Sequence, residues 1–182
     1  MLPLRLDESC VLRLVEDSDA RELAALVDAN RAYLSRWMPW APGTNVDTTR
    51  DFIRQAQEQA KRDDGFQAII ECDGRITGVV GFHRVDRANR STSIGYWIAE
   101  PAQGRGTMTK AVGAMIDIAL SDWGLNRVEI RCAPENTRSR AIPERLGFRE
   151  EATLRQAERI GDRYLDNVVY SMLASEWREA GG

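Results

Sequence analysis

The sequence has few cysteines and histidines, no long hydrophobic run and no strong charge of one sign. Its 182 residues include three cysteines and one histidine, His83. Cys10, Cys72 and Cys132 are odd in number, far apart and without CxxC spacing, so we expect three reduced thiols in a cytoplasmic protein and no metal-ligand set. No stretch approaches the roughly 18 apolar residues of a membrane span, and residues 1–5 lack a signal-peptide pattern.

The charge balance excludes further classes of protein. The formal net charge is −3 and the two signs are interspersed, so we expect no general nucleic-acid or membrane surface, although a local contact with RNA or the ribosome stays open. Hydrophobic and charged residues make up 43% and 29% of the chain, as in an ordinary globular protein. This length predicts a single domain over residues 1–182 that buries its own core.

Periodicity and turn residues predict a mixed α/β fold. Helices are expected over residues 18–30, from residue 48 to 63, over 107–123 and over a short segment that ends at Gly147. Strands are expected over 66–72, 75–84, 91–99, 127–132, 151–160 and 163–172. Residues 31–43, rich in aromatic residues and proline, are expected to form a loop. A meander of strands followed by a strand–helix–strand crossover predicts one mixed sheet.

A Gly-rich turn at residues 103–107 (Gln-Gly-Arg-Gly-Thr) points to a phosphate-containing ligand. Gly104 and Gly106 have no Cβ, so backbone N–H groups there can approach a ligand closely. The amphipathic helix that follows directs its unpaired N–H groups and its positive dipole end at the same place.

Three phosphate-binding patterns compete for this turn, beside a turn that binds nothing. A Walker loop requires Gly-Lys-Ser/Thr, which is missing, and a dinucleotide fingerprint requires a third glycine where Thr109 stands. The acyl-CoA pyrophosphate loop, Gln/Arg-x-x-Gly-x-Gly/Ala, fits except at Met108.

A second segment favours acyl-CoA. Residues 136–148 (Asn-Thr-Arg-Ser-Arg-Ala-Ile-Pro-Glu-Arg-Leu-Gly-Phe) resemble the Asn-x-x-Ser/Ala…Leu-Gly-Phe signature of GCN5-related N-acetyltransferases (GNAT), at that family's spacing from the turn. Residues 95–98 (Gly-Tyr-Trp-Ile), 103–109 and 156–158 (Gln-Ala-Glu) resemble its RimJ/RimL branch, the ribosomal-protein N-terminal acetyltransferases, in which Met commonly stands where Met108 does. The resemblance covers residues 5–175.

The resemblance implies a GNAT fold: a mixed, mostly antiparallel sheet of about seven strands, flanked by about four helices, whose central parallel pair splays to hold acetyl-CoA. The pyrophosphate would rest on the N–H groups of residues 104–109, with Arg105 adding charge, and pantetheine would pair with the backbone near Ile98 and Ala99. Residues 138–140 are expected to be solvated, with the CoA 3′-phosphate as an alternative contact for Arg140. An N–H near Ile98 would stabilise the oxyanion, and no metal is required because the thioester is already activated. The residues implied to bind acetyl-CoA are Trp97, Ile98, Ala99, Gln103, Gly104, Arg105, Gly106, Thr107, Met108, Thr109, Asn136 and Ser139.

The catalytic candidates also follow from the resemblance. Glu158 matches the proposed base of RimL-like proteins, and Ser139 matches the residue proposed to protonate or hydrogen-bond the CoA sulfur. Read without the family, Glu158 is an exposed carboxylate, Ser139 a hydroxyl that supports CoA, and Asn136 a helix cap. Many relatives use a tyrosine acid where this chain has Pro143. Because proline lacks an N–H, we expect the Ser139 carbonyl to be free or bonded to water or ligand.

The acceptor site is less defined. Of Trp37 and Trp40, we expect one to plug the core and the other to line the acceptor pocket, near Tyr33 or Phe82; His83 is expected to pack on its strand. The leading function is acetylation of a protein N-terminus, with a ribosomal protein as the family-based expectation. A small amine such as an antibiotic or aminoacyl nucleotide, and an acyl-CoA sensor without turnover, are the alternatives. The last hairpin makes a homodimer a further expectation by resemblance.

Overall fold

The computed structural model describes residues 2–179, and within this range eight strands form one sheet. The strands are β1 (Leu4–Arg5), β2 (Cys10–Leu14), β3 (Gln67–Cys72), β4 (Arg75–Phe82), β5 (Ser91–Ile98), β6 (Arg127–Cys132), β7 (Arg149–Ile160) and β8 (Arg163–Leu173). Their order is β1-β2-β3-β4-β5-β6-β8-β7, with β5 and β6 parallel and the other neighbours antiparallel. The predicted mixed, mostly antiparallel sheet with one parallel pair is confirmed.

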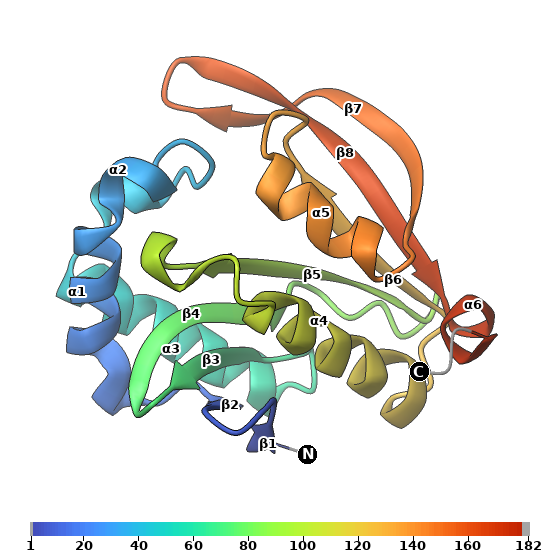
Figure 1. Cartoon of the computed structure of the whole chain (residues 1–182), viewed down its shortest axis with the longest axis horizontal. Coiled ribbons are helices and arrows are strands. Elements are labelled where there is room, and N and C mark those ends of the chain that lie inside the picture. The colour runs from blue at the N-terminus through green and yellow to red at the C-terminus, as the bar shows by residue number, and fades with distance from the viewer. Residues whose placement is uncertain (1, 180–182) are drawn as a thin grey trace.

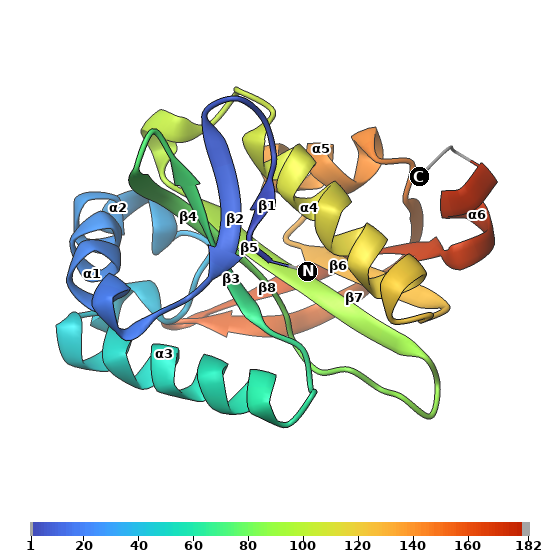
Figure 2. The same ribbon diagram turned by 90° about the horizontal axis from the view of Figure 1, so that it is seen from below.

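Six α-helices accompany the sheet in the described residues. They are α1 (Ala20–Ala29), α2 (Arg31–Leu34), α3 (Val46–Lys61), α4 (Thr107–Asp117), α5 (Thr137–Arg145) and α6 (Ala174–Glu179). Figures 1 and 2 show α1 and α3 on one face of the sheet and α4 on the other. No helix within residues 2–179 is long and apolar enough to cross a membrane.

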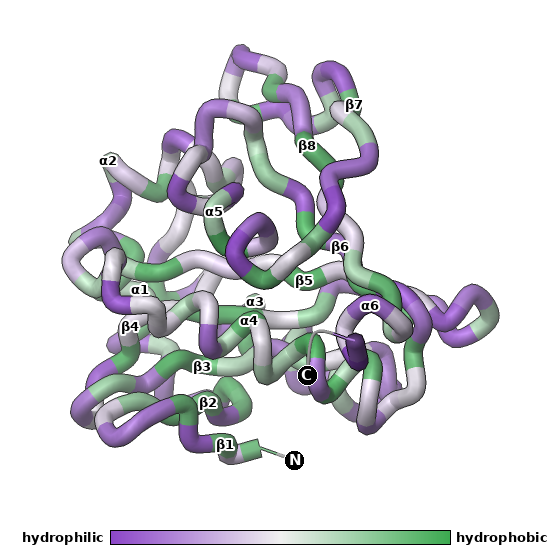
Figure 3. Tube along the Cα trace, turned by 45° about the vertical axis from the view of Figure 1, so that its right-hand side comes forward, coloured by the Kyte–Doolittle hydropathy of each residue, from purple (hydrophilic) through white to green (hydrophobic). Residues whose placement is uncertain are grey.

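The central strands are buried on both faces, so consecutive residues enter different cores. Ile70 of β3 packs in one core with Met115 of α4, whereas Ile69 packs in the other with Ile53 of α3 and Leu23 of α1. This is the alternation of a β-strand, and it explains why β3 and β4 are continuous hydrophobic runs. Figure 3 shows those hydrophobic segments in the strands and hydrophilic ones in the outer turns.

Strands β5 and β6 pair only at their beginnings. Residues 91–93 of β5 are in register with residues 127–129 of β6. Farther along, β5 continues beside β4 as far as Ile98, while β6 continues beside β8 as far as Cys132. The two parallel strands therefore separate, as the resemblance implied, and leave part of β5 without a strand on that side.

Two sequence expectations about local structure are wrong. Residues 31–43 are not simply a loop: they contain α2 and a 3₁₀ turn at Ala41–Gly43, because Leu34 and Ala41 are buried against Val27. The helix expected over 107–123 is α-helical only to Asp117 and continues as a π-helical turn over Ile118–Asp122.

The expectation of three reduced thiols is also wrong. Cys10 of β2 and Cys72 of β3 stand opposite each other in the antiparallel register and form a disulfide, whereas Cys132 is a buried free thiol. The pairing depends on β2, a short strand that the sequence patterns did not predict, so the two cysteines could not be matched from their spacing.

Candidate functional site

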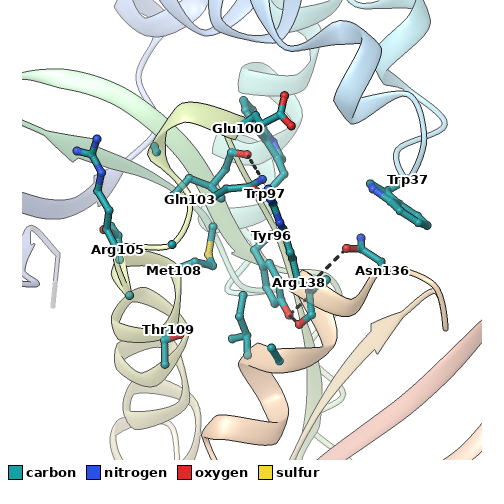
Figure 4. A pocket seen from close by; sticks show the side chains of 18 of the residues that line it. Trp37, Tyr96, Trp97, Glu100, Gln103, Arg105, Met108, Thr109, Asn136 and Arg138 are labelled. Atoms are coloured by element: carbon teal, nitrogen blue, oxygen red, sulfur yellow. Dashed lines mark hydrogen bonds between the residues drawn. The ribbon is translucent and has the colours of Figure 1, made fainter.

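A cavity of about 800 Å³ lies beside the part of β5 that β6 has left (Figure 4). Its wall is formed by the α2 region, β5, the Gly-rich turn with the start of α4, and α5. The lining residues are Tyr33, Leu34, Trp37, Met38, Tyr96, Trp97, Ile98, Glu100, Ala102, Gln103, Gly104, Arg105, Gly106, Thr107, Met108, Thr109, Lys110, Asn136, Arg138, Ser139, Ala141, Ile142 and Arg145. Apart from Ala99, every residue predicted to bind acetyl-CoA lines this cavity.

The Gly-rich turn has the geometry of an anion site. Gly104 and Gly106 have φ angles of 77° and 76°, a region that L-residues rarely adopt. Gly106 is the N-cap of α4, and the first intrahelical bond there runs from the Lys110 N–H to the Gly106 carbonyl at 3.0 Å. The N–H groups of the first turn of α4 thus lack intrahelical acceptors and can donate hydrogen bonds to the oxygens of a pyrophosphate.

Cationic side chains surround this turn. Arg105, Lys110, Arg138 and Arg145 all line the cavity, and the Arg145 guanidinium donates to the Thr109 hydroxyl at 2.9 Å. Together with the helix N-terminus they provide a positive environment suited to the phosphates of CoA.

Arg140 does not belong to this group, and its alternative contact with the 3′-phosphate stays a prediction. Its Nε donates to the Tyr170 hydroxyl at 2.7 Å, and its guanidinium forms an ion pair with Glu150 at 3.2 Å. These contacts hold Arg140 against β8 and β7, outside the cavity.

The backbone of β5 offers hydrogen-bonding groups to the cavity. The Ala99 N–H donates to the Thr77 carbonyl at 2.8 Å, and partners alternate along an antiparallel strand. The N–H and C=O groups of Tyr96 and Ile98 therefore face away from β4, toward the gap. Ile98 is placed as the resemblance implied.

Ala99 is a correction to the predicted set. Both of its backbone groups are already used, since its N–H bonds to Thr77 and its carbonyl accepts the Ala102 N–H at 3.0 Å. Its side chain is also buried and outside the cavity lining. Its N–H is therefore not available to pantetheine, and its carbonyl has one remaining lone pair.

Ser139 lies in a cluster of polar groups at the start of α5. The Asn136 side chain caps the helix by accepting the Ser139 N–H at 3.3 Å. The Ser139 hydroxyl donates to the Tyr96 hydroxyl at 3.3 Å and lies 3.2 Å from the Cys132 sulfur. Burial raises the pKa of Tyr96 well above its usual value and also raises that of Cys132, so both groups stay protonated near neutral pH.

The prediction for the Ser139 carbonyl is half right. Pro143 lies inside α5 and offers no i+4 donor, as expected, but the carbonyl is neither free nor waiting for a ligand. It accepts the Tyr96 hydroxyl at 2.9 Å. The sequence analysis did not predict a role for Tyr96. Two features could have indicated it: Tyr96 belongs to the family-like segment 95–98, and Pro143 leaves a carbonyl of α5 in need of a donor.

At the other end of the cavity, the aromatic residues are only partly where we expected them. Trp37 lines the cavity with Tyr33 and Met38, and Figure 4 shows Trp37 on the far side from Arg105. Trp40 is 42% exposed and packs its ring 5.8 Å from that of Trp97, outside the lining. Neither tryptophan is a core plug.

Phe82 and His83 lie away from this cavity. Phe82 is fully buried, with its ring 5.2 Å from Phe66 and 4.6 Å from Trp123, so the expectation that it helps bind the acceptor is wrong. The His83 ring bonds to the Ser93 hydroxyl at 3.0 Å. His83 follows the end of β4, is exposed and contacts β5 rather than its own strand. Among residues 2–179 no cluster of three His, Cys, Asp or Glu side chains could hold a metal ion.

Glu158 is not brought together with Ser139. It stands opposite Leu165, half-buried, just after an irregular register between Leu154 and Glu158 on β7, and it is not part of the cavity lining. Figure 1 shows the β7–β8 hairpin extending past α5 toward the side of the molecule that holds α2. Glu100, which the sequence analysis missed, is the carboxylate that does line the cavity.

The splayed parallel pair, the helix start suited to phosphate and the Ser139 hydroxyl beside the gap are together the features of an acetyl-CoA-dependent acetyltransferase. Residues 10–149 match the acetyltransferase (GNAT) domain family. The chain belongs to this family and is an N-acetyltransferase with acetyl-CoA as its co-substrate.

Individual relatives narrow this description. The putative ribosomal N-acetyltransferase YdaF of Bacillus subtilis is 36% identical over 179 residues, 97% of this chain and 98% of that protein. A structure of RimL, the ribosomal L7/L12 alpha-N-protein acetyltransferase, in complex with coenzyme A has a TM-score of 0.89 at 26% identity and covers 94% of this chain and 98% of its own. The microcin C7 self immunity acetyltransferase MccE, in complex with acetyl-CoA and AMP, has a TM-score of 0.88 at 28% identity, covering 93% and 95%. The GNAT fold and the RimL-like resemblance are confirmed.

Proposed function

We propose that the protein acetylates the N-terminal α-amine of a protein substrate, with ribosomal proteins as the substrate class. The observation that carries the proposal is the single cavity that joins a CoA-phosphate site at the start of α4 to an aromatic end at Tyr33, Trp37 and Met38. The similarity to YdaF and RimL, which are described as ribosomal-protein acetyltransferases, supports ribosomal proteins as the substrate class.

The reaction is a direct transfer. The neutral amine attacks the thioester carbonyl carbon, a C–N bond forms, and the C–S bond breaks to release the CoA thiolate. We propose that the Ile98 N–H stabilises the oxyanion and that the Ser139 O–H turns from the Tyr96 hydroxyl to the departing sulfur and donates to it, while the sulfur takes up one proton. The attacking amine loses one proton, and we propose Glu158 as its acceptor.

An α-amine suits this site because its pKa is about 7.7–8, whereas that of a lysine side chain is about 10.4. At pH 7 roughly a tenth to a sixth of the α-amine is already unprotonated, against less than about a thousandth of a lysine, so we propose that a base outside the cavity lining is sufficient. A lysine would require a strong base beside the thioester, and the charged side chains at the cavity are mainly cationic.

The test is release of the CoA thiol with peptides that copy the N-termini of ribosomal proteins. We expect thiol release when the peptide has a free α-amine. We expect none when the N-terminus of the same peptide is blocked and its lysine side chains stay free. Acetylation confined to lysine side chains would contradict the proposal. Binding of acetyl-CoA without release for any acceptor would favour a sensor.

A small amine attached to a nucleotide is the second candidate. The observation in its favour is the pair of aromatic side chains, Tyr33 and Trp37, at the acceptor end, since such rings can stack on a nucleobase. MccE, whose structure holds AMP, is similar in fold. Faster turnover of an aminoacyl adenylate analogue than of any peptide would favour this candidate.

We also propose a cytoplasmic location, a single domain over residues 1–182 and a homodimer. The similarity to ribosomal N-acetyltransferases supports the cytoplasmic location. The one sheet, whose strands lie between Leu4 and Leu173 in the chain, supports the single domain. The homodimer is supported by β7, a long edge strand whose Leu154 is exposed, as is Tyr164 of its hairpin partner β8. Light scattering of the purified protein tests the dimer.

A further inference from the structure

Helix α5 lacks one intrahelical hydrogen bond, and a side chain from strand β5 replaces it. Pro143 lacks an N–H, so the carbonyl four residues earlier, that of Ser139, has no intrahelical donor. An unpaired carbonyl at this partly buried place would be costly. The Tyr96 hydroxyl, from β5, donates to this Ser139 carbonyl oxygen at 2.9 Å.

This bond crosses the gap between the walls of the cavity. Tyr96 belongs to β5, two residues before Ile98, whereas Ser139 belongs to α5 on the opposite wall. At this level β5 and β6 no longer pair, so sheet hydrogen bonds do not set the width of the gap. The Tyr96 hydroxyl bonds to both the carbonyl and the hydroxyl of Ser139 and so sets their position relative to β5.

We propose that Tyr96 is a positioning residue: by holding the Ser139 carbonyl that Pro143 leaves without a donor, it fixes the Ser139 hydroxyl where the CoA sulfur departs. The inference rests on the proposed function, in which Ser139 faces that sulfur. Because burial keeps Tyr96 protonated, its hydroxyl serves as a donor to the carbonyl over the working pH range.

The first test is Tyr96→Phe, which keeps the ring and removes the hydroxyl. We expect kcat to fall about tenfold, the effect of losing one well-placed hydrogen bond, while the KM for acetyl-CoA changes by less than about twofold. An unchanged kcat would overturn the inference.

The second test is rescue by Pro143→Ala, which restores the missing N–H of α5. In the Tyr96→Phe background the new amide should bond to the Ser139 carbonyl and recover most of the lost kcat. Pro143→Ala alone should stay within about twofold of the parent, because a carbonyl oxygen can accept two donors. Equal loss of kcat with and without Pro143→Ala would overturn the positioning role.

Tyr170→Phe is the matched control. The Tyr170 hydroxyl also contacts α5, accepting from Arg140 at 2.7 Å and donating to Glu144 at 2.9 Å, but it lies outside the cavity. Its loss should lower the melting temperature and leave kcat unchanged. If Tyr170→Phe lowered kcat as much as Tyr96→Phe, general loosening of α5 would explain both, and the inference would be wrong.

Amide hydrogen exchange over residues 137–145 separates this inference from the proposed function, because it requires no turnover. We expect faster exchange in Tyr96→Phe and a return toward the parent rate when Pro143→Ala is added. If the parent acetylated no peptide, the proposed function would fail while the exchange result still stood. Unchanged exchange in Tyr96→Phe would overturn the Tyr96–Ser139 link itself.

Discussion

The two ends of the cavity are built differently. Most of the donor end is a continuous stretch of chain: β5, the Gly-rich turn and the start of α4 follow one another within residues 91–117, and the start of α5 adds Asn136 and Ser139. The acceptor end is assembled from the α2 region, with the β7–β8 hairpin reaching toward the same side from much later in the chain (Figure 1). A site made of consecutive residues has a sequence signature, whereas one made of distant loops does not.

Exchanging the Ser139 hydroxyl should have the largest effect of any change at the donor end. In Ser139→Ala the departing thiolate loses its hydrogen-bond donor, so we expect kcat to fall about 100-fold with the KM for acetyl-CoA nearly unchanged. Steady-state thiol release measures both constants. A large rise in KM with the parent kcat would show that Ser139 only binds CoA.

Glu158→Gln tests whether the hairpin takes part in chemistry. We expect kcat/KM for a peptide to fall about 30-fold at pH 6.5 and by much less at pH 9, where the α-amine, with a pKa of about 7.7–8, is already neutral. The pH profile of peptide acetylation is the measurement. A loss of the same size at every pH would remove Glu158 from proton transfer.

Gly106→Ala tests the turn. The new Cβ would meet open space, but the φ of 76° is strained for an L-residue by roughly 1–2 kcal/mol, and relief of that strain would misdirect the amides of α4. We expect the KM for acetyl-CoA to rise about tenfold and the KM for the peptide to stay constant. Gly43→Ala, at a glycine whose added Cβ also meets open space and whose φ is not in that region, is the control.

Trp37→Ala gives the opposite pattern if the acceptor lies where we propose. The KM for the peptide should rise about fivefold, because an aromatic contact is lost, and the KM for acetyl-CoA should not change. Trp40→Ala, which removes an exposed ring outside the cavity, should leave both constants alone. Equal effects of the two substitutions would place the acceptor elsewhere.

The smallest effect distinguishes two neighbouring arginines. Arg138 lines the cavity and Arg140 does not, so Arg138→Ala should raise the KM for acetyl-CoA about threefold while Arg140→Ala leaves it unchanged. The difference should shrink at high salt, because an exposed charge is screened. A rise in KM confined to Arg140→Ala would support its contact with the 3′-phosphate.

The sequence predicted the donor end of the cavity better than the acceptor end. The turn, α4 and the residues that line the cavity from them could be read from sequence, because glycine conformation and helix periodicity are local. Phe82 and Trp40 were misplaced because a strand or loop residue can face either way, and only packing against Trp123 or Trp97 decides which. Arg140 is on helix α5, and its bond to Tyr170 depends on where the helix packs on the sheet. The Cys10–Cys72 disulfide required the register of a strand too short to recognise.

The separation of β5 from β6 also has a thermodynamic consequence. Beyond residue 93, the backbone groups of Tyr96 and Ile98 face the gap, where no strand pairs with them and the Ile98 carbonyl accepts the Gln103 side chain at 3.5 Å. We expect acetyl-CoA to pair with these groups in the folded state and not to bind the unfolded chain. Its concentration therefore enters the stability of the protein as RT ln(1 + [L]/Kd), about 2.7 kcal/mol at 100 times Kd. A higher acetyl-CoA concentration is therefore expected to raise the free energy of unfolding as well as the rate of turnover.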